Sequence, residues 1–148
     1  MGNFKMVILN TLVIRVDNNS KIGLGHVMRC RAFAQAWARQ GGHSIFVMAD
    51  PSPIILKRLV SENIQVELLD SPADEIKYID KIGDQNSAEW LIIDGYQFGA
   101  EYIQALKGRR WKILLIDDGI PLPSVSYTHL RAHETSLHLV CRLLVEKK

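Results

Sequence analysis

Apolar runs alternate along the chain with longer amphipathic stretches, a pattern that predicts an α/β fold. Short runs rich in β-branched residues predict five strands, at residues 6–16, 44–49, 65–69, 89–94 and 111–117. Apolar residues at helical spacing predict helices between them, at residues 25–40, 53–62, 72–82 and 99–107. Strands joined by crossover helices form parallel sheets. We therefore expect a Rossmann-like, doubly wound parallel sheet of about five strands.

Local signals mark the helix boundaries. Gly41 and Gly42 predict the end of the first helix, because glycine readily adopts the backbone conformation that terminates helices. Pro53 predicts the start of the second helix. Ser71 is expected to cap the third helix, with Pro72 at its first position.

Composition places the chain among ordinary globular domains. Of its 148 residues, 47% are hydrophobic and 23% are charged, so a wholly disordered chain is excluded. No apolar run approaches the roughly 20 residues that a membrane span needs. Two cysteines, Cys30 and Cys141, cannot form a disulfide framework. We expect a cytoplasmic protein without a membrane partner.

The formal net charge of +2 comes entirely from the last part of the chain. Residues 1–124 carry equal numbers of acidic and basic side chains, whereas residues 125–148 carry the basic excess. No basic patch with interleaved aromatic residues occurs in the sequence. We therefore expect no nucleic-acid partner.

The segment 125–148 resembles the translation of a transposase mosaic-end sequencing adapter. One reading frame of that DNA encodes Val125–Thr135 and, after a variable index, Leu139–Lys148 with a single difference at Val145. The resemblance implies a non-native tail on a domain of residues 1–124. His129 and His133 have the i,i+4 spacing of zinc ligands on a helix, but the adapter accounts for them. We expect no metal site.

Candidate chemistry gathers where the predicted strands end, because ligands of such sheets bind at the carboxyl ends of the strands. The first strand ends in Asp17 and leads to a Gly23-Leu24-Gly25 turn. That turn lacks the third glycine of the dinucleotide-binding fingerprint, since position 28 is methionine, and the chain has no P-loop motif. The fourth strand ends in Asp94-Gly95-Tyr96, and the fifth in Asp117-Asp118.

His26 stands at the predicted start of the first helix, with Arg29 one turn further on. An imidazole can transfer protons near neutral pH. Asp94 and Tyr96 could orient His26 or bind a ligand hydroxyl group, and Asp118 could contact the same ligand. Purely structural roles remain open: His26 as a helix cap, Arg29 paired with a surface acid, Asp94 as a cap of the next helix, and Asp118 bound to loop amides.

Three further residue types favour structural roles. His43 precedes the second strand and lies away from the ligand-binding edge. Cys30 falls on the apolar stripe of the first helix, which indicates a buried thiol rather than a nucleophile. The three tryptophans occupy apolar positions of predicted helices and strands and are expected in the core: Trp37, Trp90 and Trp111.

The chain resembles the UDP-sugar hydrolases of pseudaminic acid biosynthesis, a family also described as spore-coat polysaccharide biosynthesis proteins. The resemblance rests on four motifs in the same order: Ile14–Asp17, Ile22–Cys30, Asp94–Tyr96 and Ile116–Asp118. The family is similar to GT-B glycosyltransferases, which have two Rossmann-like domains. The resemblance implies a UDP-sugar substrate and cleavage by water without a cofactor or metal.

The same resemblance implies roles for individual residues. His26 would activate water, Tyr96 would position the sugar or the water, and the Gly23–Gly25 loop would approach the sugar phosphate. Asp17 would line the substrate cleft. Arg29, Asp94 and Asp118 complete the expected substrate-binding set.

The resemblance covers nearly all of residues 1–124, so we expect this segment to be the N-terminal GT-B-like domain. A C-terminal nucleotide-binding domain would be missing, and the chain alone would be inactive or nearly so. Two alternatives stay open at this point, a GT-B glycosyltransferase and a non-catalytic nucleotide-sugar-binding domain.

Overall fold

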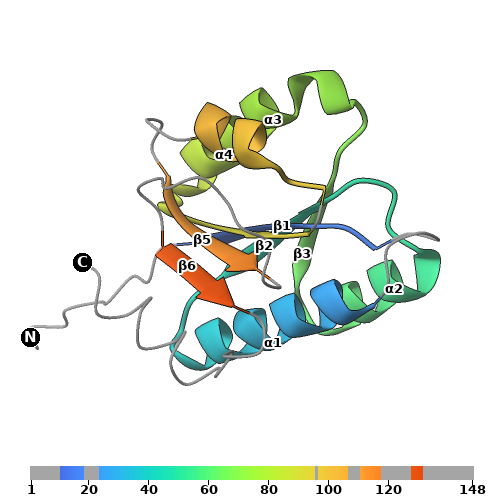
Figure 1. Cartoon of the computed structure of the whole chain (residues 1–148). Helices are drawn as coiled ribbons and strands as arrows, with labels where there is room; N and C mark the ends of the chain where they lie inside the picture. The colour runs from blue at the N-terminus through green and yellow to red at the C-terminus, as the bar shows by residue number, and fades with distance from the viewer. Residues whose placement is uncertain (1–10, 19–23, 96, 107–110, 118–127, 132–148) are drawn as a thin grey trace, which may run out of the picture.

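The computed structural model describes residues 11–18, 24–95, 97–106, 111–117 and 128–131 (Figure 1). Its strands are β1 (Leu12–Val16), β2 (Ser44–Met48), β3 (Gln65–Leu68), β4 (Trp90–Asp94), β5 (Lys112–Asp117) and β6 (Thr128–Arg131). Its α-helices are α1 (Gly25–Arg39), α2 (Pro53–Ser61), α3 (Glu75–Asn86) and α4 (Ala100–Leu106). The strands form one sheet in the order β3-β2-β1-β4-β5-β6.

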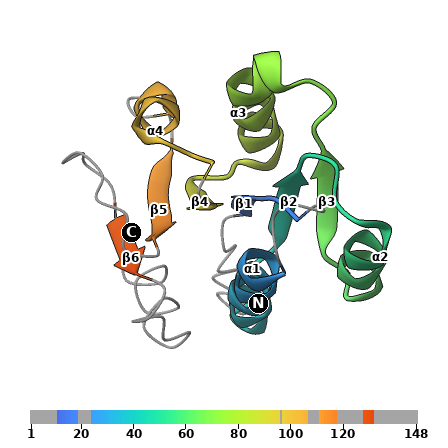
Figure 2. The same cartoon turned by 45° about the vertical axis from the view of Figure 1, so that its right-hand side comes forward.

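Every neighbouring pair of strands is parallel. Figures 1 and 2 show α1 and α2 on one face of the sheet and α3 and α4 on the other. The doubly wound parallel sheet expected from the sequence is therefore confirmed. The strand order is that of the Rossmann fold, in which the chain leaves β1 in one direction and later returns to its other side.

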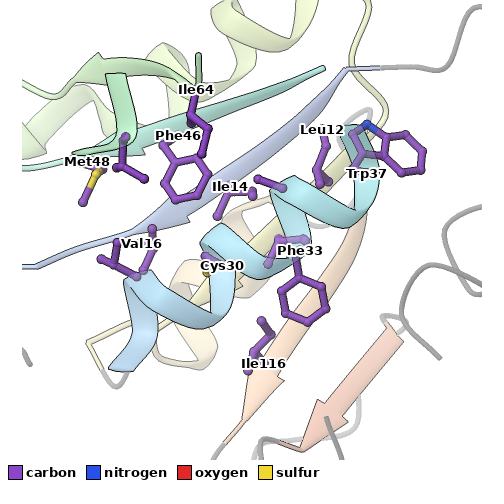
Figure 3. Close-up of a cluster of buried hydrophobic side chains, with 14 of the residues drawn as sticks. Leu12, Ile14, Val16, Cys30, Phe33, Trp37, Phe46, Met48, Ile64 and Ile116 are labelled. Carbon is purple, nitrogen blue, oxygen red and sulfur yellow. The ribbon is translucent and has the colours of Figure 1, made fainter. Parts of the chain in front are cut away.

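The core consists of two apolar layers separated by the sheet. Residues of one strand alternate between the layers, because successive strand side chains point to opposite faces. Leu12, Ile14 and Val16 pack against α1 (Figure 3), whereas Val13 packs on the α3–α4 side. Trp37 and Trp90 lie in the first layer and Trp111 in the second, so the prediction that all three are core residues is confirmed.

The ends of α1 and α2 follow the sequence signals closely. Gly41 has a positive φ of 88°, and the Gly42 amide donates to the Trp37 carbonyl at 3.0 Å, which terminates α1 as predicted. The Ser52 hydroxyl accepts a hydrogen bond from the Ile55 amide at 3.4 Å and caps α2.

The third predicted helix differs at both ends. A 3-10 turn occupies Pro72–Asp74, and α3 begins at Glu75 and runs to Asn86 instead of ending near residue 82. Ser87 ends the helix with a φ of 51°, while the Ala88 amide donates to the Gly83 carbonyl at 2.9 Å. The additional turn begins with Gly83, a residue of low helix propensity that is nevertheless buried together with Ile79 and Ile82.

The sheet has one strand more than the five expected, and this strand, β6, lies in the adapter-like segment. The open edge of β5 offers backbone hydrogen-bonding groups that an extended segment can pair with, whatever its origin. Residues 1–10 lie outside the described residues, so the expected strand start at residue 6 is not among the structural observations. His133 also lies outside the described residues, so the structural observations do not include the spacing of His129 and His133.

Candidate functional site

The candidate site lies at the carboxyl ends of β1 and β4, which are neighbours in the sheet. Val16 pairs with Asp94, and Asp94 in turn pairs with Ile116 of β5, so the three polar strand ends meet at one edge as expected. The helices that follow β1 and β4 cover opposite faces. This arrangement is the topological switch point, where ligands of open α/β sheets bind.

Asp94 is the centre of the site on the α1 face. Its side chain is fully buried, with 0% exposure, and points from the end of β4 to the first turns of α1. Arg29 donates to both carboxylate oxygens, from Nε to Oδ2 and from Nη2 to Oδ1, each at 2.5 Å. This two-pronged pairing provides the counter-charge that a buried carboxylate needs.

His26 shares the same carboxylate. Its Nδ1 atom lies 2.6 Å from Oδ1 of Asp94 and 3.0 Å from Nη2 of Arg29, which also donates to Oδ1. Because the carboxylate is the closer neighbour and can only accept, we assign Nδ1 as the donor, which leaves the lone pair of this tautomer on Nε2. Such a carboxylate fixes both the tautomer and the orientation of a histidine, the arrangement used by histidine general bases.

Cys30 also contacts Asp94, with Sγ at 3.5 Å from Oδ2. Burial raises the pKa of the Cys30 thiol well above its ordinary value, and the Asp94 charge raises it further. The thiol thus stays protonated at neutral pH, which agrees with the expected buried, unreactive cysteine.

The start of α1 leaves room in front of the site. A Cβ added to Gly25 would meet no atom within 4 Å. The preceding residue, Leu24, occupies the cap position without a side-chain hydrogen bond to the helix, and the first turn holds no acidic residue. The open space at Gly25 suits the close backbone approach to a ligand that the sequence predicts for this loop. Gly23 lies outside the described residues.

A second charged cluster occupies the opposite face of the same strand ends. Arg15 of β1 is 3% exposed and donates to Glu75 of α3, from Nε at 3.1 Å and from Nη2 at 3.0 Å. It also donates to Asp17 at 2.5 Å and 3.1 Å, and its guanidinium group lies 4.8 Å from the ring centre of Phe98. Burial alone lowers the pKa of Arg15, but the hydrogen bonds to Glu75 and Asp17 outweigh burial and raise it.

The structure brings together three of the predicted site residues, His26, Arg29 and Asp94, with Gly25 on the same helix turn. Arg29 pairs with a buried carboxylate, so the alternative that it pairs with a surface acid is wrong. Asp17 lies instead in the Arg15 cluster, and the prediction that it contacts a substrate stays a prediction. Tyr96 and Asp118 lie outside the described residues.

Sequence reasoning missed Arg15 and its partner Glu75. Arg15 could have been identified from the sequence, because it is the single charged residue in the otherwise apolar strand Leu12–Val16. No pattern linked it to Glu75, which is 60 positions away. His43 is exposed and bonds to Gln65 at 3.0 Å, next to the amino ends of β2 and β3, which agrees with a structural role.

Two observations concern other kinds of site. Within the described ranges, no group of three or more His, Cys, Asp or Glu side chains is arranged to hold a metal ion. The described helices also include none that combines the length and apolar character of a membrane span.

Comparison with known proteins supports the fold. No family model matches the chain, and no curated protein matches it in sequence. Among solved structures, MurG from Acinetobacter baumannii, a GT-B glycosyltransferase, is similar with a TM-score of 0.56 at 10% sequence identity. The likeness covers 91% of this chain but only 39% of MurG. The chain therefore has a Rossmann-like α/β fold of the kind found in GT-B proteins, and it spans about two fifths of the length of that neighbour.

Proposed function

We propose that this chain provides the catalytic-base half of a nucleotide-sugar hydrolase that releases UDP and a free 2,4-diacetamido-trideoxy sugar. The observation that carries the proposal is the 2.6 Å contact between His26 Nδ1 and the buried Asp94 carboxylate at the switch point of the sheet. A histidine held in this way presents its basic Nε2 atom in a fixed direction, which is what activation of a water molecule requires.

The proposed reaction balances without any further reactant. The oxygen of a water molecule attacks the anomeric carbon, and Nε2 of His26 takes one of its protons. The bond between the anomeric carbon and the UDP oxygen breaks, and its electron pair leaves with UDP. Asp94 holds the imidazole and stabilises the imidazolium that forms, while Arg29 balances the buried Asp94 charge.

Other residues enter the proposal through the family resemblance. The Gly23–Gly25 loop would approach the sugar phosphate, and the open space at Gly25 supports a close approach. Tyr96 and Asp118 would contact the sugar from the ends of β4 and β5. Amides at the start of α1 would favour the negative charge of the leaving diphosphate.

The likeness to 39% of MurG supports a second domain in the complete enzyme, which would supply the uridine and diphosphate contacts. We therefore propose residues 1–124 as its N-terminal domain and the 148-residue chain as inactive or nearly so. Cytoplasmic location and independence of metal ions belong to the same proposal.

Glycosyl transfer is the second candidate, and the likeness to a glycosyltransferase favours it specifically. In that reaction His26 would take the proton of an acceptor hydroxyl group instead of water, and a glycoside would form. The two reactions differ in their product, so chemical identification of the released sugar separates them.

The test uses the longer protein in which residues 1–124 continue into a second domain, together with the 148-residue chain. With the UDP-sugar as substrate, we expect UDP and free sugar from the longer protein. His26→Gln should lower turnover by about 100-fold or more, the usual contribution of a general base. His43→Gln is the matched control, because His43 is exposed and distant from the strand ends that form the site.

Several results would contradict the proposal. Normal turnover in the His26→Gln variant would exclude His26 as the base. Glycoside as the main product would favour transfer over hydrolysis. Tight binding of the UDP-sugar without any turnover would favour a non-catalytic binding domain. Turnover by the 148-residue chain equal to that of the longer protein would overturn the proposal that the chain is incomplete.

A further inference from the structure

The Asp17 carboxylate joins three segments of the chain at the carboxyl edge of the sheet. Its Oδ1 atom accepts from Arg15 Nη1 at 2.5 Å and from the Ala49 amide, just after β2, at 2.8 Å. Its Oδ2 atom accepts from Arg15 Nη2 at 3.1 Å and from Gln97 Nε2, in the loop after β4, at 3.0 Å. Four hydrogen bonds thus use both oxygens of a side chain that is 8% exposed.

Stability alone does not explain this buried group of charges. The network contains two carboxylates, Asp17 and Glu75, but one cation, Arg15, and so carries a net charge of −1. Removal of these charged groups from water costs desolvation free energy. An apolar residue at position 15 would continue the pattern of β1, whose other residues are all apolar and buried. A buried charged network is therefore better explained by the geometry that it imposes than by the stability that it adds.

The geometry imposed by the network concerns the chain directly after Asp94. Gly95 has a φ of 153°, and a Cβ there would collide with the side chains of Gln97 and Phe98, so glycine is the residue that fits at this point. Gln97 is then held by Asp17, and Phe98 lies beneath the Arg15 guanidinium group. The end of β4 is thus held by His26 and Arg29 on one face and by this network on the other.

We propose that Arg15, Asp17 and Glu75 form a positioning network that keeps Asp94 directed at His26, and that Asp17 acts through this network rather than by touching the substrate. Strand pairing transmits the effect, because Arg15 pairs with Ile93 and Val16 pairs with Asp94 in the sheet. The consequence for catalysis rests on the proposed function, whereas the positioning itself does not.

The variant Asp17→Asn tests the positioning in the 148-residue chain without any substrate. An amide nitrogen in place of one carboxylate oxygen would face hydrogen-bond donors from Arg15 and from Gln97 or Ala49. The readout is the NMR signal of the His26 Nδ1 proton, together with exchange of the Ala49 amide, which donates to Asp17 Oδ1. We expect the Nδ1 proton and this amide to exchange about tenfold faster with solvent, as in a local opening.

Glu62→Gln is the matched control. Glu62 also accepts two hydrogen bonds from one arginine, Arg31, at 2.6 Å and 2.8 Å, but it lies away from the carboxyl ends of the strands. It should leave the His26 signal unchanged. If Asp17→Asn impairs folding, Gln97→Met removes a single bond of the network and should produce the same change in weaker form. An unchanged His26 signal in a folded Asp17→Asn or Gln97→Met variant overturns the proposal, and so does an equal acceleration of exchange throughout the sheet.

The second part of the test uses turnover of the longer protein. Asp17→Asn should lower kcat by about tenfold with KM within about threefold of the original value, because a misaligned base slows the chemical step without removing a substrate contact. A large rise in KM with unchanged kcat would mean that Asp17 binds substrate, against the proposal. If the unaltered longer protein releases no UDP, the proposed function fails, but the NMR result still decides on the positioning network.

Discussion

Replacement of Asp94 by asparagine is the perturbation whose effect on stability the structure defines best. The carboxylate is fully buried and accepts hydrogen bonds of 2.5–2.6 Å from Arg29 and His26. Asparagine keeps the shape but directs an NH2 group at one of these donors and removes the carboxylate charge that pairs with Arg29. Removal of one partner of a buried ion pair costs about 3–5 kcal/mol. The Arg29 side chain is 21% exposed and can turn partly to water, so we expect a loss of about 3 kcal/mol.

Urea unfolding of the 148-residue chain measures this loss. With an m-value of about 2 kcal/mol per molar, the unfolding midpoint should fall by about 1.5 M. Arg29→Met in the same chain should also destabilise it, because Asp94 then loses its cation. The double variant should be more stable than the sum of the two losses predicts, with a coupling energy of about 1.5 kcal/mol or more. A loss below about 0.5 kcal/mol for Asp94→Asn, or additive losses, would refute the assignment of Asp94 and Arg29 as a coupled buried pair.

Three further predictions concern single sites. Gly42→Ala should destabilise the chain by about 1–3 kcal/mol in thermal unfolding, because the new Cβ would lie 2.3 Å from Nε1 of the buried Trp37. Gly99→Ala, where a Cβ meets nothing within 4 Å, is the control and should not show this loss. Gly25→Ala should raise the stability of the chain by up to about 1 kcal/mol, since it replaces a glycine in a helix with open space around it. On the proposed function it should also weaken UDP-sugar binding by the longer protein, measured by calorimetry, and unchanged binding would contradict a close ligand approach at Gly25. Burial raises the pKa of Cys30 above its ordinary 9.0, so the unfolded chain loses this proton first. The free energy of unfolding should therefore fall as pH rises above about 9, and less steeply in Cys30→Ala; equal slopes would contradict this.

Local sequence signals were sufficient for the element types and for several helix ends. The β-branched runs identified β1 to β5, and Gly41 ended α1, because these features act through backbone preferences of a few neighbouring residues. The same reasoning ended α3 too early. Its last turn passes through the buried Gly83 and ends at a left-handed Ser87, neither of which local propensity reveals.

The sequence by itself determined the α/β class, the parallel sheet and the expectation that His26, Arg29 and Asp94 lie near the carboxyl edge of the sheet, the first two at a helix start and Asp94 at a strand end. Only the tertiary structure decided that they meet, because His26 and Asp94 are 68 positions apart and contact only when β4 lies next to β1. It also decided that Asp17 faces away from them, joined to Arg15 and Gln97. Side chains near the same strand ends reach opposite faces of the sheet, and the face that each one reaches depends on strand order and crossovers, which involve the whole chain.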